Sequence, residues 1–145
     1  MSERVKITFK RGALDKILNY LVEGYPFEAA GLMLSEQGVR KVVDFIPVKN
    51  VHKGDIRVRY AVDPLEYYRA EKQAEERGLE IIGVCHSHPD VAPRPSAYDL
   101  EYALPGWSYL IASVTKGRVL GYACWRALDK GGDKQFAEEE ISITD

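Results

Sequence analysis

The chain has 145 residues, of which 46% are hydrophobic, and this is enough for one domain with a continuous core. Its formal charge of −2 is close to zero, so we expect neither nucleic acid nor a membrane surface as a partner. The first residues form no apolar leader, and no segment has the length and apolarity of a membrane span. We therefore expect a cytoplasmic protein.

The hydrophobic pattern predicts strands and helices that alternate along the chain. Strands are expected at residues 5–9, 29–34, 39–48, 56–60, 81–85, 107–114, 119–127 and around 141–143, the last as an edge strand. Helices are expected around residues 14–22, from Pro64 to about Arg77, and from Ser96 to before Pro105. Three helices on a mixed, mostly antiparallel sheet predict a single-domain α/β sandwich.

Two histidines follow the short apolar run 81–85, which has the character of a buried central strand. Residues two apart on a strand point to the same face, so His86 and His88 can bind one metal ion together. Cys85 has the opposite parity and is expected in the core. Like Cys124, it is expected to be a free thiol, because two cysteines are too few for a disulfide framework. The alternative for the histidines is a solvated strand end without metal.

Ser96 and Asp99 allow two interpretations. A serine followed three residues later by an acid is a capping box, which satisfies amide donors at the start of a helix. The other interpretation makes Asp99 a third metal ligand. Two imidazoles and a carboxylate suit tetrahedral zinc, with a fourth position for water, as in a catalytic site. We favour the ligand role, because the histidines otherwise lack a third partner, and Ser96 can cap the helix in either case.

Glu28 lies far upstream, directly before an apolar strand. Most glutamates are simply exposed. At the mouth of a cleft, however, this side chain is a candidate base acting on the water. His52 lies in a polar loop and is interpreted as a surface residue or, at most, a substrate contact.

Together these residues resemble the JAMM (MPN-plus) metallopeptidases, in the small prokaryotic stand-alone form. The pattern His-Ser-His-Pro, followed by Ser96 and Asp99, matches the family motif without a gap, and Glu28 stands in Glu-Ala-Ala-Gly-Leu-Met-Leu. The likeness covers nearly the whole chain, so residues 1–145 are expected to form one domain with the cytidine-deaminase-like JAMM fold. One departure is Ala30, where many relatives carry cysteine, and we expect altered packing there without loss of activity.

The resemblance implies one zinc ion per chain held by His86, His88 and Asp99, with Glu28 as general base and Ser96 as oxyanion support. It also implies cleavage of a peptide, isopeptide or amide bond after the C-terminal Gly-Gly of a ubiquitin-like protein. A sulfur-carrier adduct, such as carrier–cysteine, is the preferred substrate, because the short chain has little room for insertions that grip ubiquitin chains. The rival functions are a metal-free scaffold that binds protein partners and a zinc deaminase, whose HxE and PCxxC motifs this chain lacks.

Overall fold

The computed structural model describes residues 4–49 and 63–145. The strand expected at 56–60 and the proposed surface position of His52 lie outside these ranges. The described elements, in chain order, are β1 (Val5–Lys10), α1 (Arg11–Glu23), β2 (Ala30–Glu36), β3 (Lys41–Val48), α2 (Pro64–Glu76), β4 (Leu79–Pro89), α3 (Ala97–Tyr102), β5 (Ser108–Thr115), β6 (Arg118–Lys130) and β7 (Asp133–Thr144). The predicted α/β class is confirmed.

The strands form a mixed sheet in the order β1-β3-β2-β4-β5-β6-β7, which closes into a barrel. Closure depends on β1, which pairs in parallel with both β3 and β7. The β4–β5 pair is also parallel, and the other pairs are antiparallel. The sheet is therefore mixed and mostly antiparallel, as predicted.

The last strand is longer than expected and is not an edge strand, so that prediction is wrong. β7 pairs with β6 along one side and with β1 along the other, where Ile141 is opposite Ile7 and Ile143 is opposite Phe9. The spacing of Ile141 and Ile143 in the sequence indicates only which face of the strand is apolar. It carries no information on how many neighbouring strands form hydrogen bonds.

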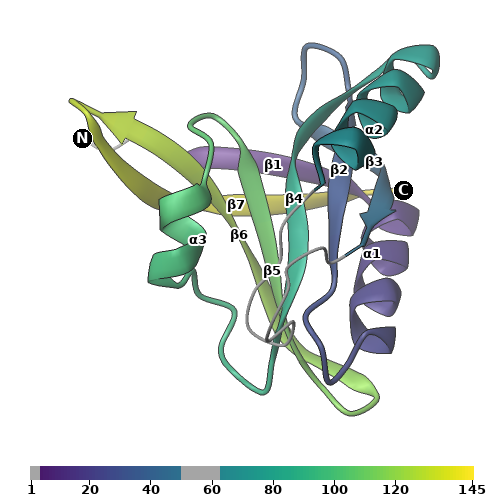
Figure 1. Cartoon of the computed structure of the whole chain (residues 1–145), viewed down its shortest axis with the longest axis vertical. Coiled ribbons are helices and arrows are strands. Elements are labelled where there is room, and N and C mark those ends of the chain that lie inside the picture. Colours follow the sequence, from purple (N-terminus) through teal and green to yellow (C-terminus); the bar gives the residue numbers. More distant parts are fainter. Residues whose placement is uncertain (1–3, 50–62) are drawn as a thin grey trace.

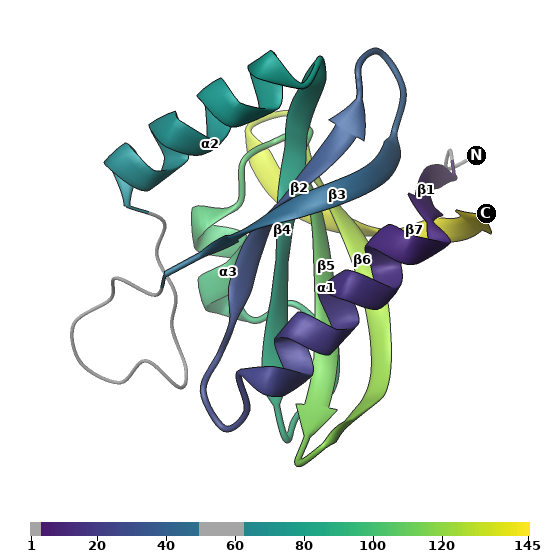
Figure 2. The same ribbon diagram turned by 90° about the vertical axis from the view of Figure 1, so that its right-hand side faces the viewer.

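Two apolar clusters fill the two faces of the sheet. Helix α1 places Ala13, Leu14, Ile17 and Leu21 on the sheet, and it lies on the opposite side of the strands from α3 (Figures 1 and 2). Each fully buried leucine or isoleucine contributes roughly 1.5–3 kcal/mol. The second cluster contains Ala30, Leu32, Val48, Ala70, Val84, Ala103, Tyr109 and Ala127. Helix α1 therefore covers one face and leaves the face of α3 for the site.

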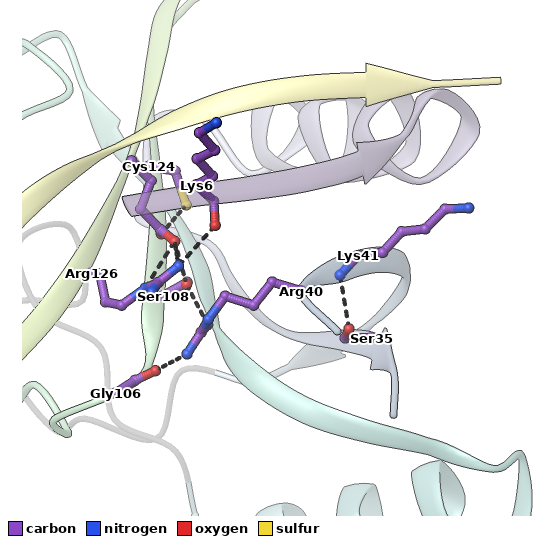
Figure 3. A network of polar contacts seen from close by, with 9 residues as sticks. Lys6, Ser35, Arg40, Lys41, Gly106, Ser108, Cys124 and Arg126 are labelled. Atoms are coloured by element: carbon purple, nitrogen blue, oxygen red, sulfur yellow. Dashed lines mark hydrogen bonds and ion pairs between the residues drawn. The ribbon is translucent and has the colours of Figure 1, made fainter. Parts of the chain in front are cut away.

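A buried polar network ties the closing strands together (Figure 3). The Glu139 side chain is fully buried, and Arg126 donates to its Oε2 from both Nε and Nη2, at 3.1 and 2.7 Å. Ser108 and Cys124 also donate to this carboxylate. Arg126 further donates to the carbonyl of Lys6, at 2.8 Å. The network thus links β1, β5, β6 and β7 where the barrel closes.

Two tight connections between neighbouring strands contain glycine. Gly38 and Gly117 have φ of 79° and 82°, a region that glycine adopts without steric cost, and they connect β2 to β3 and β5 to β6. No helix in the described part of the chain is both long and apolar enough to span a membrane.

Candidate metal and catalytic site

Strand β4 places both histidines inside the protein. It lies between β2 and β5 and continues through Pro89, so His86 and His88 belong to the strand itself. His86 is 0% exposed and His88 is 8% exposed, and their ring centroids are 5.0 Å apart. The alternative of a solvated strand end is therefore wrong. Cys85 lies in the α1-side cluster, so its predicted core position is confirmed.

Helix α3 brings Asp99 to the two imidazoles. One carboxylate oxygen, Oδ1, lies 3.5 Å from Nε2 of His86, and Oδ2 lies 3.3 Å from Nε2 of His88. Ligand atoms about 2.0–2.1 Å from a tetrahedral zinc are about 3.3–3.4 Å apart. The donor types suit zinc, and each of the two oxygen–nitrogen separations is close to the spacing between two ligands of one ion.

The capping and ligand interpretations of Asp99 are compatible. The backbone N–H of Ser96 donates to Asp99 Oδ2 at 2.8 Å, and the N–H of Asp99 donates to Ser96 Oγ at 3.0 Å. This is the predicted capping box, with Ser96 at the N-cap of α3. The carboxylate that turns back to the cap also faces both histidines. Capping therefore fixes the carboxylate in place and does not direct it away from them.

The protonation states of His86 and Asp99 suit metal binding, whereas the raised pKa of His88 opposes it. Burial lowers the pKa of His86 to about 4, although Asp99 opposes this shift. Burial by itself lowers the pKa of His88, but hydrogen bonding to Asp99 and to the carbonyl of Ala92 outweighs it, so the net pKa is raised. Burial raises the pKa of Asp99, yet the contact with His88 lowers it to about 2. At neutral pH His86 is therefore neutral and Asp99 is ionised, as ligands must be.

The loop between the histidines and α3 is held by two contacts. Nδ1 of His88 lies 3.1 Å from the carbonyl oxygen of Ala92, and this pairing leaves Nε2 directed toward Asp99. The indole N–H of Trp125 in β6 donates to the carbonyl of Pro93 at 3.1 Å. A carbonyl that fixes the orientation of a histidine ring is a common support for metal ligands.

Glu28 reaches the histidine pair through the pairing of β2 with β4. In this register Ala30 is opposite His86. Just before it, the N–H of Ala29 donates to Ser87 Oγ at 2.9 Å, and the N–H of Ser87 donates to the carbonyl of Ala29 at 3.0 Å. Glu28, His86 and His88 each offer a ligand atom within 4.8 Å of the other two. The structure therefore gathers all five predicted site residues around one strand end.

Two carboxylates flank the histidines, and they differ in position. The Asp99 oxygens lie 3.3 and 3.5 Å from the Nε2 atoms of the two histidines. Glu28 is partly buried just before β2 and offers an oxygen within 4.8 Å of a ligand nitrogen of each histidine. Both carboxylates lie near the histidine pair, and Glu28, the less buried of the two, has the position expected of a base.

Sequence reasoning missed the residues that support the site. Ser87 and Trp125 carry no motif of their own, and their partners Ala29 and Pro93 lie 58 and 32 positions away in the chain. One weak signal for Ser87 is its place between the two histidines, where it has the opposite strand parity. A side chain of opposite parity to the ligands faces neighbouring backbone and not the metal.

Known proteins resemble this chain over most of its length. The model of the Prok-JAB family, described as prokaryotic homologs of the JAB domain, matches residues 10–128. A protein from Haloferax volcanii named desampylase is 36% identical over 74% of this chain and 81% of its own length. A Thermus thermophilus protein named "Probable TtuB-protein conjugate cleaving protease" is 34% identical over 64% of this chain and 60% of its own length.

Solved structures have the same fold. A solution structure from Desulfitobacterium hafniense superposes with a TM-score of 0.77 at 30% identity and covers 95% of this chain and 92% of its own. A JAB1/MPN domain protein from Archaeoglobus fulgidus, at 18% identity and a TM-score of 0.55, covers 99% of this chain and 100% of its own, and supports the fold alone.

The fold and these relatives define a hydrolase of the JAMM type, an isopeptidase. The chain belongs to the Prok-JAB family of prokaryotic JAB-domain homologs. The predicted resemblance is thereby confirmed.

Proposed function

We propose that this protein is a zinc-dependent isopeptidase that cleaves the bond after the C-terminal Gly-Gly of a ubiquitin-like sulfur-carrier protein, in a protein conjugate or an adduct such as carrier–cysteine. The observation that carries the proposal is the Asp99 carboxylate, which spans the Nε2 atoms of His86 and His88 with Glu28 close by. The names of the relatives from Haloferax volcanii and Thermus thermophilus support the substrate class.

The ligand set of the proposed metal centre is His86, His88 and Asp99, with one zinc ion per chain. When bound, zinc lowers the pKa of a coordinated water toward about 7 and polarises a carbonyl oxygen. The chain supplies the neutral imidazole of His86 and the ionised carboxylate of Asp99 for this purpose, and His88 would have to lose any proton it carries before it binds the metal. The Ala92 carbonyl orients the ring of His88, and the Ser96 amide orients the carboxylate of Asp99.

Glu28 acts as general base in this proposal. It accepts a proton from the attacking water and delivers it to the leaving amine as the carbon–nitrogen bond breaks. The products are a carrier ending in a Gly-Gly carboxylate and a released amine, so atoms and charges balance. Its position beside the histidines, fixed through Ala29 and Ser87, supports this role.

Ser96 supports the developing oxyanion. Its oxygen accepts the Asp99 amide at 3.0 Å, which fixes the hydroxyl at the N-terminus of α3. The hydroxyl hydrogen can then be donated to the carbonyl oxygen as negative charge develops there. A Gly-Gly tail is narrow enough to approach these groups as an extended segment.

The test combines metal content with cleavage of a Gly-Gly carrier joined to lysine or cysteine through an amide. Glu28→Gln should retain about one zinc per chain and lose at least about 100-fold in rate, the lower range of general-base contributions. Glu23→Gln, at an exposed glutamate nearby, is the matched control and should cleave like the wild type. Loss of zinc from Glu28→Gln would make Glu28 a ligand and overturn the assignment.

Absence of zinc from the wild type after reconstitution would favour the scaffold and direct attention to protein partners. The single domain over residues 1–145 and the cytoplasmic location stay predictions.

A further inference from the structure

The residue directly after the histidine motif has an unusual backbone. Asp90 has φ of 62°, the left-handed region in which a side chain is strained and glycine is favoured. Among the described residues no other non-glycine has positive φ. Asp90 is exposed, so burial does not explain the choice of residue. Aspartate is among the few non-glycine residues that adopt this region readily, so the contacts of its carboxylate are the informative feature.

The Asp90 carboxylate joins two segments on either side of the site. The hydroxyl of Tyr25 lies 2.9 Å from Oδ2 and 3.1 Å from Oδ1, and Thr115 donates to Oδ1 at 3.1 Å. The Asp90 N–H donates to the carbonyl of Val114 at 2.8 Å. Asp90 is thus anchored on β5 and reaches across to the turn that follows α1.

Glu28 directly follows that turn. The turn begins at the end of α1, where the Tyr25 N–H donates to Val22, and it is closed by the Phe27 N–H donating to Gly24 at 3.0 Å. Gly24 packs so closely that a Cβ there would lie 2.8 Å from Cβ of Ala29. Glu28 is therefore held on one side by the Ala29–Ser87 pair and on the other by the Tyr25–Asp90 contact.

We propose that Asp90 is a positioning residue for Glu28: its carboxylate, held in a left-handed backbone against β5, binds the Tyr25 hydroxyl and fixes the turn that presents the base to the histidine pair. This rests on the proposed function. The segment His86–Asp90 then has two roles. His86 and His88 face the proposed metal, and Ser87 and Asp90 hold the segment that contains Glu28.

Three variants test the proposal. Asp90→Gly removes the carboxylate and the strain, Tyr25→Phe removes only the hydroxyl, and Asp90→Asn keeps an acceptor oxygen in a residue that tolerates positive φ. Asp90→Gly and Tyr25→Phe should each lower kcat by about 10- to 100-fold, the cost of small misplacement of a reacting group. KM and zinc content should stay near wild type, and Asp90→Asn should retain most of kcat.

The double variant Tyr25→Phe/Asp90→Gly should be no slower than Asp90→Gly alone, because both changes break one contact. Tyr68→Phe, at an exposed tyrosine on α2, is the matched control and should be unchanged. Wild-type kcat in Asp90→Gly, additive losses in the double variant, or loss of zinc in parallel with rate would each overturn the proposal.

Amide hydrogen exchange separates this proposal from the proposed function. Asp90→Gly and Tyr25→Phe should raise exchange of the amides of residues 24, 25 and 27–29 and leave those of β5 protected. If the wild type cleaves no Gly-Gly substrate, the proposed function fails and exchange alone decides whether Asp90 holds the turn. Unchanged exchange at residues 24, 25 and 27–29 refutes the role of Asp90 whatever the activity.

Discussion

The substitution Asp99→Asn separates the two jobs of one carboxylate. In the capping box Asp99 Oδ2 accepts the Ser96 N–H at 2.8 Å, and an asparagine oxygen can accept the same hydrogen bond. Between the histidines the substitution removes the negative charge that lies 3.3 and 3.5 Å from the two Nε2 atoms. Zinc in proteins takes its oxygen ligands from Asp or Glu, so Asn is a poor replacement. We therefore expect a nearly intact helix cap and a damaged metal site.

The expected loss of zinc affinity follows from the proposed role of Asp99 as a metal ligand. Replacing an outer-shell partner of a ligand costs about 10- to 100-fold in metal affinity, so loss of a ligand should cost at least about 100-fold. This corresponds to about 2.8 kcal/mol. In excess zinc the folded state loses the same amount of stabilisation. At roughly 2–4 °C per kcal/mol, the rise in Tm caused by zinc should shrink by about 6–11 °C.

The assay is thermal unfolding of the metal-free protein with and without zinc, together with a competition titration against a chelator. Ser96→Ala is the control, because it removes the cap oxygen and leaves the carboxylate. It should lower the free energy of unfolding by about 1 kcal/mol without zinc and keep zinc affinity within about tenfold. If Asp99→Asn binds zinc within about tenfold of wild type and shows the same rise in Tm, Asp99 is a capping residue and the ligand assignment is wrong.

Three further outcomes are expected. Burial raises the pKa of Cys85 to about 12 and that of Cys124 well above its usual value, so both thiols stay protonated at about pH 8. A thiol reagent should therefore label neither cysteine until denaturant is added. Labelling of the native protein would contradict this expectation. Arg126→Met leaves the buried Glu139 carboxylate without its ion-pair partner and should lower the free energy of unfolding, measured with denaturant, by about 3–5 kcal/mol. The double variant Arg126→Met/Glu139→Leu should lower it by less. An equal or larger loss in the double variant would show that the unpaired charge is not the cause. Gly83→Ala places a Cβ 1.8 Å from a backbone carbonyl of β5 and should cost more than the usual ~1–3 kcal/mol of overpacking; wild-type stability would show that the β4–β5 pair yields easily.

Local sequence patterns predicted the elements that carry the site because their causes are local. Ser96 and Asp99 form the capping box within one helical turn, and the parity of His86 and His88 follows from strand geometry. The boundaries were less accurate, since β4 extends through both histidines and not only up to them. That extension depends on β5, whose pairing with β4 continues to Pro89.

Local patterns in the amino-acid sequence predicted the proposed chemistry of this protein: two imidazoles at strand spacing, an aspartate in a capping box, a glutamate before an apolar strand, and a family resemblance that joins them. Three features depend on the folded arrangement of the whole chain: His86 is fully buried, the Asp99 carboxylate contacts both the helix cap and the histidines, and the Asp90 carboxylate accepts the Tyr25 hydroxyl beside the turn that precedes Glu28. Contacts between residues tens of positions apart depend on strand register and barrel closure. Those are properties of the whole sheet, and alternation within any one strand does not encode them.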